Sequence, residues 1–396
     1  MKVYIIGTGV NGRNSLTCEA AEAIEHSQLL IGGERMLLPY SSSGKKLVRA
    51  YRPKDIRDVL QNNTYSAASV LMSGDCGFFS GTKKLLPLIE NMNPIVISGV
   101  SSVAYFCSRM NISYESMKYI SLHGKNANIA INVLMNEKCF FLLGGDINAA
   151  EICRKLCEFG LPDVMVYIGE NLGYEDEICH KGKAKEFINI RTEKLCVLVT
   201  ENSAYLKHIP SAISDGEFIR DSIPMTKSAV RGNIISGLNI CHDSVCWDIG
   251  CGTGSVSVEM AFRCPDGIVF AFDKKHDAAE LTVRNARKFG CDNIIVNEGI
   301  CPETLKNAPI PNKVFIGGSS GNMAEIFEYV YQKNESADIT VSAVSLETLE
   351  QAVKAFECFG RVSSVIQIAV TETRKVGGHT MLTAQNPIFI IKGGQQ

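Results

Sequence analysis

Residues 244–254 read SVCWDIGCGTG, an apolar run that ends in three glycines at alternate positions. The apolar part is typical of a buried β-strand, and the amphipathic stretch that continues through Met260 predicts a helix directly after the glycines. Glycine suits the turn between them because it adopts positive φ and lets the backbone come close to a ligand. The free N–H groups of the first helical turn face the same place. The segment therefore predicts a strand–loop–helix unit that binds a small molecule.

The spacing of the glycines separates the possible ligands. A dinucleotide site is typical of Gly-x-Gly-x-x-Gly, which places a pyrophosphate at the helix N-terminus. Here the third glycine comes one residue earlier, and the carboxylate of Asp248 before the first suits a cationic amino-acid group better than a phosphate. Asp273 ends the next expected strand, where it can accept both hydroxyls of a ribose. The alternative is a plain glycine turn with a solvated aspartate. The combination predicts an S-adenosylmethionine site formed by Asp248, Gly250, Cys251, Gly252, Thr253, Gly254 and Asp273.

The alternation of strands and helices continues to the C-terminus and predicts a doubly wound, Rossmann-like α/β domain of the class I methyltransferase type. Its strands are expected at 245–249, 268–273, 294–297, 314–316, 339–342, 362–370 and 387–391. A separate α/β series precedes it, with strands expected at 3–6, 28–31, 68–72, 95–97, 118–121, 139–143, 164–168 and 195–200. The stretch between the two contains Pro210 and Asp215-Gly216 with little periodicity, which is typical of a linker. We therefore expect a first domain over 1–203, a linker over 204–223 and a second domain over 224–396.

The composition of the 396 residues is that of a globular protein, with 45% hydrophobic and 21% charged residues. The net charge of −2 argues against a general nucleic-acid binder, although local positive pockets for an acidic substrate remain open. The 15 cysteines contain no Cys-x-x-Cys pair, so we expect no metal site and a reducing compartment. No signal-peptide pattern and no apolar stretch of about 18 residues occurs. We expect a soluble, cytoplasmic protein without a membrane partner.

A second glycine-rich stretch follows the first expected strand. Residues 7–12, GTGVNG, match the dinucleotide fingerprint, but residues 13–15 separate them from the next helix, and the position of the expected acidic residue falls in a turn. Two further loops, 73–80 and 98–102, also follow strands, so all three could converge at one edge of a parallel sheet. The alternatives are three unrelated turns or a nicotinamide-dinucleotide site of a reductase.

These three loops, in this order, resemble the tetrapyrrole methylase family, whose members bind S-adenosylmethionine between two α/β subdomains. The second loop of the family reads Gly-Asp-Pro-x-Phe, whereas residues 74–78 here read GDCGF, and Cys76 in place of proline should loosen the turn. Residues 170–173, ENLG, with Asp176-Glu177 after them, resemble the branch that methylates C5 of the corrin precursor. The resemblance implies a second S-adenosylmethionine site formed by Gly7, Gly9, Gly74, Asp75, Phe78, Ser101 and Ser102.

The second half resembles the decarboxylating C15-methyltransferases that act on the same tetrapyrrole. The resemblance is carried by PMTK at 224–227, FIGGS at 315–319, GHT at 378–380 and NP at 386–387. It implies that Thr226 and Cys301 line the cofactor site. Together the two resemblances imply a bifunctional methyltransferase of corrin-ring (cobalamin) biosynthesis, which methylates C5 and C15 of precorrin-6B or its cobalt form and decarboxylates the C12 acetate side chain. Members of the family commonly form homo-oligomers.

The substrate implied by this resemblance is a polycarboxylate, which lysine and arginine would anchor. Lys227 and Arg231 lie four residues apart and would share one face of a helix, so we assign them to substrate binding; the alternative is a solvated cationic pair. His379 follows two glycines on an expected loop and could contact a carboxylate or carry a proton, unless it is structural. In the first half Asp75 is the best catalytic candidate, unless it only fixes its own loop by hydrogen bonds. Glu170 is a weaker candidate.

Overall fold

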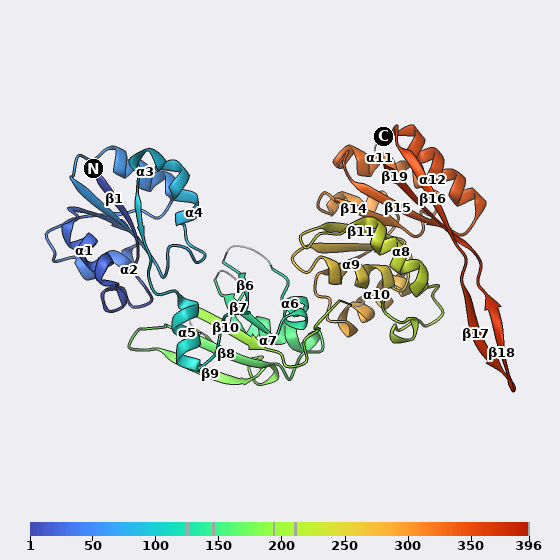
Figure 1. The fold of residues 1–396 in the computed structure, drawn as a ribbon, viewed down its shortest axis with the longest axis horizontal. Coiled ribbons are helices and arrows are strands. Elements are labelled where there is room, and N and C mark those ends of the chain that lie inside the picture. Colours follow the sequence, from blue (N-terminus) through green and yellow to red (C-terminus); the bar gives the residue numbers. More distant parts are fainter. Residues whose placement is uncertain (124–126, 145–146, 193–194, 210–211, 395–396) are drawn as a thin grey trace. The chain divides into compact units, whose positions relative to one another are not determined.

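The structure is a computed structural model that describes residues 1–123, 127–144, 147–192, 195–209 and 212–394 (Figure 1). The chain divides into two compact units, and each is described by itself. The first unit consists of Met1–Asn126, Glu137–Ile152 and Val164–Glu201. The second unit consists of Ala127–Asn136, Cys153–Asp163 and Asn202–Gln396.

The first sheet of the first unit is parallel throughout, with the strand order β3-β2-β4-β1-β5. Its strands are β1 (Lys2–Gly7), β2 (Leu29–Gly32), β3 (Lys46–Arg49), β4 (Ala67–Met72) and β5 (Ile95–Ile97). Ile5 packs in one buried cluster and its neighbour Ile6 in another, because successive side chains point to opposite faces of a strand. Both faces are therefore covered, which explains the nearly continuous apolar sequence of the central strands.

Short helices cover these two faces. They are α1 (Cys18–His26), α2 (Glu34–Leu37), α3 (Pro53–Gln61) and α4 (Thr82–Leu85), with 3₁₀ turns η1 (Gly12–Ser15), η2 (Leu38–Tyr40), η3 (Leu86–Leu88) and η4 (Glu90–Met92). Helix α1 begins after Thr17, whose hydroxyl accepts a hydrogen bond from the N–H of Ala20 at 3.2 Å. After the GTGVNG stretch the chain thus forms the 3₁₀ turn η1 and then a short extended segment before α1. No long helix therefore starts at these glycines.

The second sheet of the first unit has the order β6-β7-β10-β8-β9, and only the pair β6 and β7 is parallel. Its strands are β6 (Lys118–Ser121), β7 (Lys138–Leu142), β8 (Met165–Glu170), β9 (Ile178–Lys183) and β10 (Cys196–Glu201). The accompanying helices are α5 (Ser102–Met110), α6 (Ala130–Met135), α7 (Ala149–Glu158) and the turn η5 (Ala184–Glu186). Helix α6 and the second half of α7 belong to the second unit.

Asp292 holds α6 within the second unit. Its carboxylate accepts hydrogen bonds from the N–H of Ile129 at 2.7 Å and of Ile131 at 2.9 Å, at the start of the helix. The ammonium group of Lys155 lies 3.1 Å from the same carboxylate. The side chain of Ile131 is fully buried in a core cluster of the second unit. An anion at a helix N-terminus satisfies N–H groups that have no partner within the helix.

The second unit contains a seven-stranded sheet with the order β13-β12-β11-β14-β15-β19-β16. Its strands are β11 (Val245–Ile249), β12 (Ile268–Asp273), β13 (Ile294–Glu298), β14 (Lys313–Ile316), β15 (Asp338–Ala343), β16 (Val362–Ile368) and β19 (Ile388–Gly394). The five neighbouring strands β13, β12, β11, β14 and β15 are parallel to one another. Strand β19 runs antiparallel to both of its neighbours, β15 and β16. This arrangement confirms the expected doubly wound domain, with a reversed strand near one edge.

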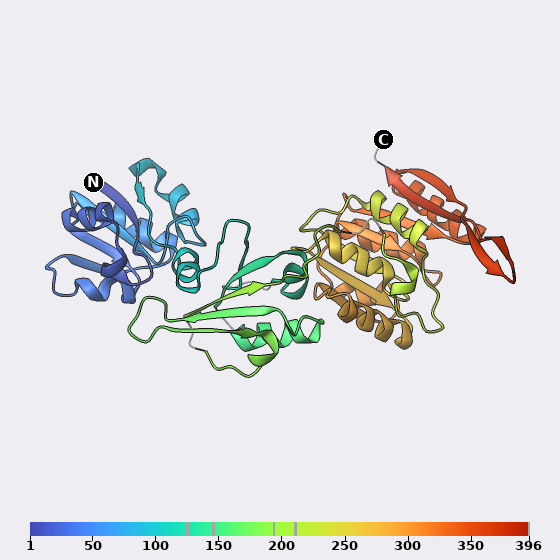
Figure 2. The same cartoon turned by 60° about the horizontal axis from the view of Figure 1, so that its bottom comes forward.

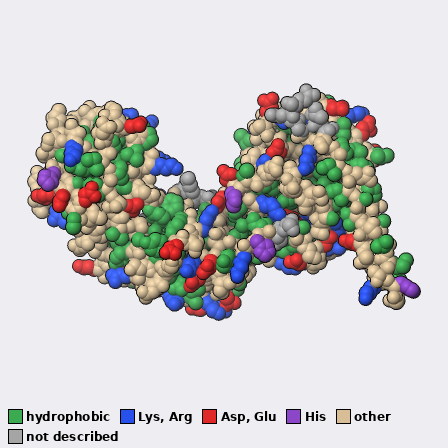
Figure 3. Space-filling model, in the orientation of Figure 1, with side chains coloured by type: hydrophobic (Ala, Val, Ile, Leu, Met, Phe, Trp, Pro, Cys, Tyr) green, Lys and Arg blue, Asp and Glu red, His purple; other side chains and the backbone are tan. Residues whose placement is uncertain are grey.

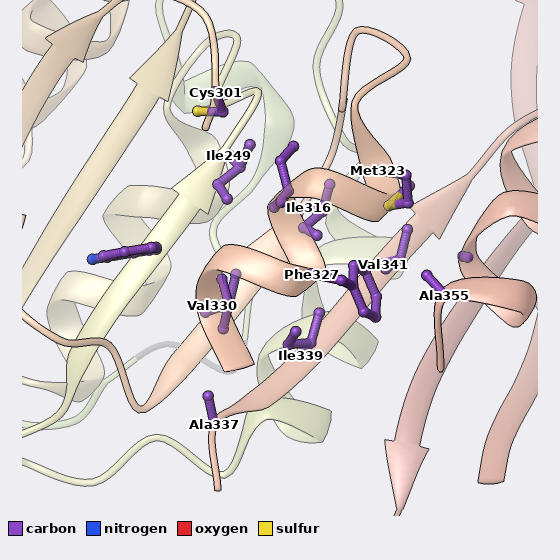
Figure 4. Close-up of a cluster of buried hydrophobic side chains, with 14 of the residues drawn as sticks. Ile249, Cys301, Ile316, Met323, Phe327, Val330, Ala337, Ile339, Val341 and Ala355 are labelled. Carbon is purple, nitrogen blue, oxygen red and sulfur yellow. The ribbon is translucent and has the colours of Figure 1, made fainter. Parts of the chain in front are cut away.

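Helices cover both faces of this sheet. They are α8 (Ser228–Leu238), α9 (Ser255–Arg263), α10 (His276–Lys288), α11 (Met323–Lys333) and α12 (Leu346–Cys358), with 3₁₀ turns η6 (Asp215–Glu217) and η7 (Glu303–Asn307). Figure 4 shows one face, where Phe327 and Val330 of α11 pack over Ile316, Ile339 and Val341. Within the described residues, no helix is long and apolar enough to cross a membrane.

Two observations differ from the expected organisation. Residues 204–223 pack into the second unit, because Ile213 and Phe218 are buried in its core; residues 210–211 of this stretch lie outside the described ones. The antiparallel strands β17 (Thr371–Val376) and β18 (His379–Ala384) form a ribbon that the sequence did not predict. Figure 2 shows this ribbon extending away from the seven-stranded sheet, and Figure 3 shows hydrophobic side chains on its surface.

Candidate functional site

A pocket of about 400 Å³ opens at the carboxyl ends of the parallel strands in the second unit. Its walls come from the loops after β11, β12, β13, β14 and β15, and from the segment that precedes α8. This is the edge at which open α/β sheets bind ligands. Of the residues predicted for the cofactor, the structure places six in the lining of this pocket: Thr226, Gly250, Cys251, Gly252, Asp273 and Cys301.

The glycine loop after β11 adopts a conformation that requires glycine. Gly250, Gly252 and Gly254 have φ of 77°, 56° and 73°. A Cβ atom on Gly250 would lie 2.6 Å from the backbone nitrogen of Gly318, closer than real Cβ contacts. The loops after β11 and β14 therefore touch backbone to backbone, an approach that a side chain at residue 250 would prevent.

Asp273, at the end of β12, joins two parts of the pocket wall. Its Oδ2 accepts a hydrogen bond from the N–H of Gly252 at 3.0 Å, and its Oδ1 accepts one from the N–H of Lys275 at 3.0 Å. A carboxylate offers about four lone-pair sites, so both oxygens keep capacity for the hydroxyls of a ligand. The position and chemistry of Asp273 thus fit the ribose contact expected of it.

Asp248 lies beneath the loop instead of in the pocket lining. Its side chain is completely buried, and the hydroxyl of Ser257 donates a hydrogen bond to its Oδ2. Its Oδ1 has no hydrogen-bond partner among the described residues. Burial raises the pKa of this carboxyl to about 7; the Ser257 bond lowers the pKa and the nearby charge of Asp273 raises it. Direct contact with a cationic ligand group is therefore not what this geometry offers.

Thr253 and Gly254 also lie behind the pocket. Thr253 is buried, and its carbonyl accepts a hydrogen bond from the side-chain amide of Asn285 in α10 at 2.8 Å. Gly254 precedes the first residue of α9, and a Cβ atom there would lie 2.7 Å from Thr282. The two residues fix where the glycine loop enters α9, while Gly250, Cys251 and Gly252 form the part of the loop that lines the pocket.

Arg231 does not lie in the pocket, in contrast to the role predicted for it. Its side chain is fully buried in α8, and its guanidinium donates to Asp215 at 2.7 Å and to Glu259 at 2.9 Å. It also donates to the carbonyl of Thr226 at 2.5 Å and lies over the ring of Phe218. These contacts fix the segment before α8 against the domain. Arg231 is therefore bonded within the domain and does not line the pocket.

Lys227 and His379, the other two residues assigned to the substrate, are not part of the pocket lining. The side chain of Lys227 is 31% exposed and lies 3.7 Å from Asp215, next to the pocket residue Thr226. His379 is exposed and begins β18, directly after the glycine turn of the ribbon, and it is not part of the pocket lining. None of the three residues assigned to the substrate lines the pocket; Lys227 and Arg231 lie next to the lining residue Thr226, by sequence and by a hydrogen bond respectively.

The three glycine-rich loops of the first unit converge, as predicted, at the carboxyl ends of β1, β4 and β5. Gly9 and Gly74 exchange two backbone hydrogen bonds of 3.0 Å. A Cβ atom on Gly99 would lie 2.4 Å from the carbonyl oxygen of Gly74 and 2.5 Å from that of Gly7. The loops thus meet through their backbones, and this close approach explains why glycine occupies all three. Three unrelated turns would not show such contacts.

Asp75 connects two of these loops. Its Oδ1 accepts a hydrogen bond from the N–H of Gly77 at 2.7 Å, and its Oδ2 accepts one from Gly99 at 3.1 Å. Ser101 precedes α5, and its hydroxyl accepts from the N–H of Ala104; Ser102 is the first residue of that helix. Phe78 packs edge-on against Tyr119 and Phe140 of the second sheet.

Glu170 belongs to an ion pair at the end of β8. Its carboxylate lies 2.9 Å from Nε2 of His180 on β9, and the Glu170 side chain is 5% exposed. Gly173, three residues later, lies against Val10 and Asn11 of the first loop. The histidine partner was missed because it follows on a strand, β9, that the sequence did not reveal.

The pocket also contains residues that sequence reasoning missed. They come from the ends of the same strands, which was the only available signal, and from the segment before α8: Ile223, Met225, Lys274, Lys275, Ile300, Ser319, Ser320, Ser342, Val344 and Ile388. Burial raises the pKa of the Cys251 thiol well above its ordinary value and also raises that of Cys301, so both thiols are neutral. Within the described residues, no group of His, Cys, Asp or Glu side chains could hold a metal ion.

Comparison with known families and proteins gives two matches that divide the chain. The model of the precorrin methyltransferase domain matches residues 217–393. The model of the tetrapyrrole (corrin/porphyrin) methylases matches residues 2–188. Each half therefore matches the type of family that its motifs resemble.

Curated relatives match the second half. The chain is 38% identical over 173 residues to a probable cobalt-precorrin-6B C(15)-methyltransferase (decarboxylating) of Pyrobaculum calidifontis, covering 43% of this chain and 89% of the relative. It is 36% identical over 192 residues to the Saccharolobus solfataricus protein of the same name, covering 47% and 96%. A solved structure of a precorrin-6Y C5,15-methyltransferase from Geobacter metallireducens is 34% identical, covers 48% of this chain and all (100%) of that one, and has a TM-score of 0.45.

Proposed function

The chain belongs to the precorrin methyltransferases, and we propose that it is a fused, bifunctional member that methylates two carbons of one tetrapyrrole. The second unit would transfer a methyl group to C15 and release the carboxyl group of the C12 acetate side chain as CO₂, which leaves a methyl group at C12. C15 methylation and decarboxylation are what the names of the curated relatives state for those proteins. The first unit would methylate C5, in line with its match to the tetrapyrrole methylases. The observation that carries the proposal is the pocket in which a glycine loop and Asp273 meet at the carboxyl ends of parallel strands.

We propose two S-adenosylmethionine sites per chain, one in each unit. In the second unit Asp273 would bind the ribose, with Gly250, Cys251 and Gly252 beneath the amino-acid part and Cys301 beside the adenine. Thr226 would close the site from the segment before α8. In the first unit the converging loops of Gly7, Gly9, Gly74 and Ser101 would form the second site, and Asp75 would hold two of them together.

Domain limits of 1–203 for C5 methylation, 204–223 for the connection and 224–396 for C15 methylation remain our proposal. The packing of Ile213 and Phe218 suggests that the connecting residues also support the second domain. Assembly into homo-oligomers remains a proposal from the resemblance.

Positioning is the main task of the residues described. When bound, S-adenosylmethionine supplies an electrophilic methyl group on a sulfonium, so the enzyme needs alignment more than a strong base. Asp273 would fix the ribose through lone pairs that its two backbone hydrogen bonds leave free. The Gly250 and Gly318 backbones would let the acceptor carbon come close, because no side chain covers them.

Supplying precorrin-6B and cobalt-precorrin-6B separately to the full chain tests this function. The product mass should show two methyl groups gained and one CO₂ lost from at least one of the two substrates. Methyl transfer without loss of CO₂ would contradict the role of the second unit. A gain of one methyl group together with CO₂ loss would contradict the role of the first.

A further inference from the structure

The pocket of the second unit is large enough for one small ligand. Its volume of about 400 Å³ lies near the lower end of the roughly 300–1,000 Å³ that small-molecule sites occupy. Asp273 and the glycine loop assign that space to the cofactor in the proposed function. A tetrapyrrole, which is larger than the cofactor and must reach it, therefore has to lie across the mouth of the pocket.

Exposed apolar side chains lie on two sides of this mouth. Ile300 follows β13 and is 52% exposed, while Val344 follows β15 and is 74% exposed; both line the pocket. Leu346, at the start of α12, is 73% exposed and extends the apolar surface beyond Val344. Because β13 and β15 flank the three strands β12, β11 and β14 in the sheet, Ile300 and Val344 lie on opposite sides of the opening. Exposed apolar residues at the rim of a pocket are typical of a ligand-binding groove.

Between Ile300 and Val344 the pocket is bordered by glycine backbone without side chains. Gly317 and Gly318 follow β14, are exposed and line the pocket. A Cβ atom on Gly318 would meet nothing within 4 Å, so open space lies above this backbone. A flat molecule resting on Ile300 and Val344 would span this gap and could approach the cofactor from above the glycines.

Positive charge is found at the same opening. Lys274 and Lys275 follow β12, are exposed and line the pocket. Both belong to the β12 side, next to Asp273, whereas the β15 side contributes Val344 and Ser342 to the lining. An apolar surface with cations at one edge is complementary to a flat macrocycle that carries its carboxylates around its rim.

We propose that Ile300, Val344 and Leu346 form the surface on which one face of the tetrapyrrole rests during C15 methylation. Lys274 and Lys275 contact carboxylates at the rim of the macrocycle. This inference rests on the proposed function, since it assigns the substrate surface of the same site. It replaces the earlier assignment of Arg231, whose guanidinium is buried and already bonded.

The test uses the full-length chain with Val344→Asp/Leu346→Asp. Both positions are exposed, and Leu346 begins a helix, where an acidic residue is favourable, so the fold should not suffer. The matched control is Ile310→Asp. Ile310 is 58% exposed but precedes β14, so it lies at the amino ends of the parallel strands, whereas the pocket lies at their carboxyl ends. A Val344→Asn/Leu346→Asn variant separates the loss of apolar contact from the added negative charge.

C15 methylation and CO₂ release are measured against the concentration of precorrin-6B or its cobalt form, and S-adenosylmethionine binding is measured by calorimetry. We expect KM for the tetrapyrrole to rise about tenfold or more in the Asp variant and less in the Asn variant, with cofactor affinity unchanged. An unchanged KM, or an equal rise in Ile310→Asp, would overturn the inference. Failure of the proposed function looks different: the wild-type chain would then release no CO₂ from either substrate.

Discussion

The two glycine-rich regions of this chain, one in each unit, bring backbones together in different ways. In the first unit Gly7, Gly74 and Gly99 come from loops far apart in the sequence and meet through their backbones. In the second unit one continuous loop, residues 250–254, carries three glycines with positive φ, and Gly318 and Asp273 approach it from the ends of the two neighbouring strands. The first site therefore draws its glycines from the loops after β1, β4 and β5, whereas the second combines one glycine loop with the ends of the strands beside it.

The largest expected effect comes from adding a Cβ atom where the backbones meet. Gly99→Ala should abolish C5 methylation and leave C15 methylation and CO₂ release intact, because its Cβ would lie 2.4 Å from Gly74. Gly250→Ala should do the reverse, since its Cβ would lie 2.6 Å from Gly318 and its φ is positive. The position of each methyl group in the product can be read by mass spectrometry and NMR. Loss of both activities in either variant would show that the two sites are not independent.

Gly81→Ala is a matched control for these variants. The backbone of Gly81 has no positive φ, and an added Cβ would meet nothing within 4 Å. Both methylations should continue at the wild-type rate in this variant. A loss here would mean that substitution of glycine is harmful for reasons other than close approach.

The carboxylates that connect the loops provide the next contrast. Asp273→Ala should weaken cofactor binding in the second unit by about a hundredfold, because it removes charged hydrogen bonds to the ligand as well as those to Gly252 and Lys275. Asp75→Ala removes one hydrogen bond within its own loop and one to the loop of Gly99, and it should destabilise the first unit by about 1–3 kcal/mol. Calorimetric titration should find one strong site left in the Asp273 variant. Two unchanged sites would exclude Asp273 from ribose binding.

The buried carboxyl group of Asp248 should make the stability of the second unit depend on pH. Its pKa in the folded chain is about 7, above the ordinary value of 3.8, because burial disfavours the charged form. Between these values the folded chain keeps a proton that the unfolded chain releases. The free energy of unfolding should therefore fall as pH rises from about 4 to 7, by at most about 4 kcal/mol from this group. Asp248→Asn keeps a partner for Ser257 and should remove this part of the slope.

Unfolding in urea at several pH values, followed by the fluorescence of the single tryptophan, would measure this effect. Trp247 is fully buried in β11 beside Asp248, so its signal reports on the second unit. If the free energy of unfolding changed equally with pH in the wild-type chain and in the Asp248→Asn variant, Asp248 would not be the cause of this pH dependence.

The smallest effect is expected at His379. Its side chain is exposed at the turn of the β17–β18 ribbon and is not part of the pocket lining. His379→Ala should leave cofactor affinity and both methylations within about twofold of wild type. A large loss of C15 methylation would show that the β17–β18 ribbon contributes to the site of the second unit.

Prediction from the sequence succeeded where the signal was local. The strand at 245–249 and the helix from Ser255 are observed as expected, because the apolar run and the glycines that specify them are adjacent. The convergence of the three loops in the first unit was predictable from parallel topology alone. Their atomic contacts were not, because the partners are residues of other loops.

Prediction failed where the long-range environment decides the role of a residue. Helix periodicity placed Lys227 and Arg231 on one face, but only the distant residues Asp215 and Glu259 show that Arg231 is buried. The ribbon was missed because its strands are exposed and carry no apolar alternation. His379 was assigned to a functional loop, although its two preceding glycines form a hairpin turn.

The interleaving of the two units has a consequence for synthesis on the ribosome. The chain passes between the units five times, since residues 127–136 and 153–163 belong to the second unit although the first unit ends at Glu201. Ile131 is buried in a cluster that also contains Phe262 and Cys291, so some of its core partners are made more than a hundred residues later. Until then, an apolar face of α6 stays without its final cover on the growing chain. A nascent chain stalled between these points should bind chaperones that a complete chain does not.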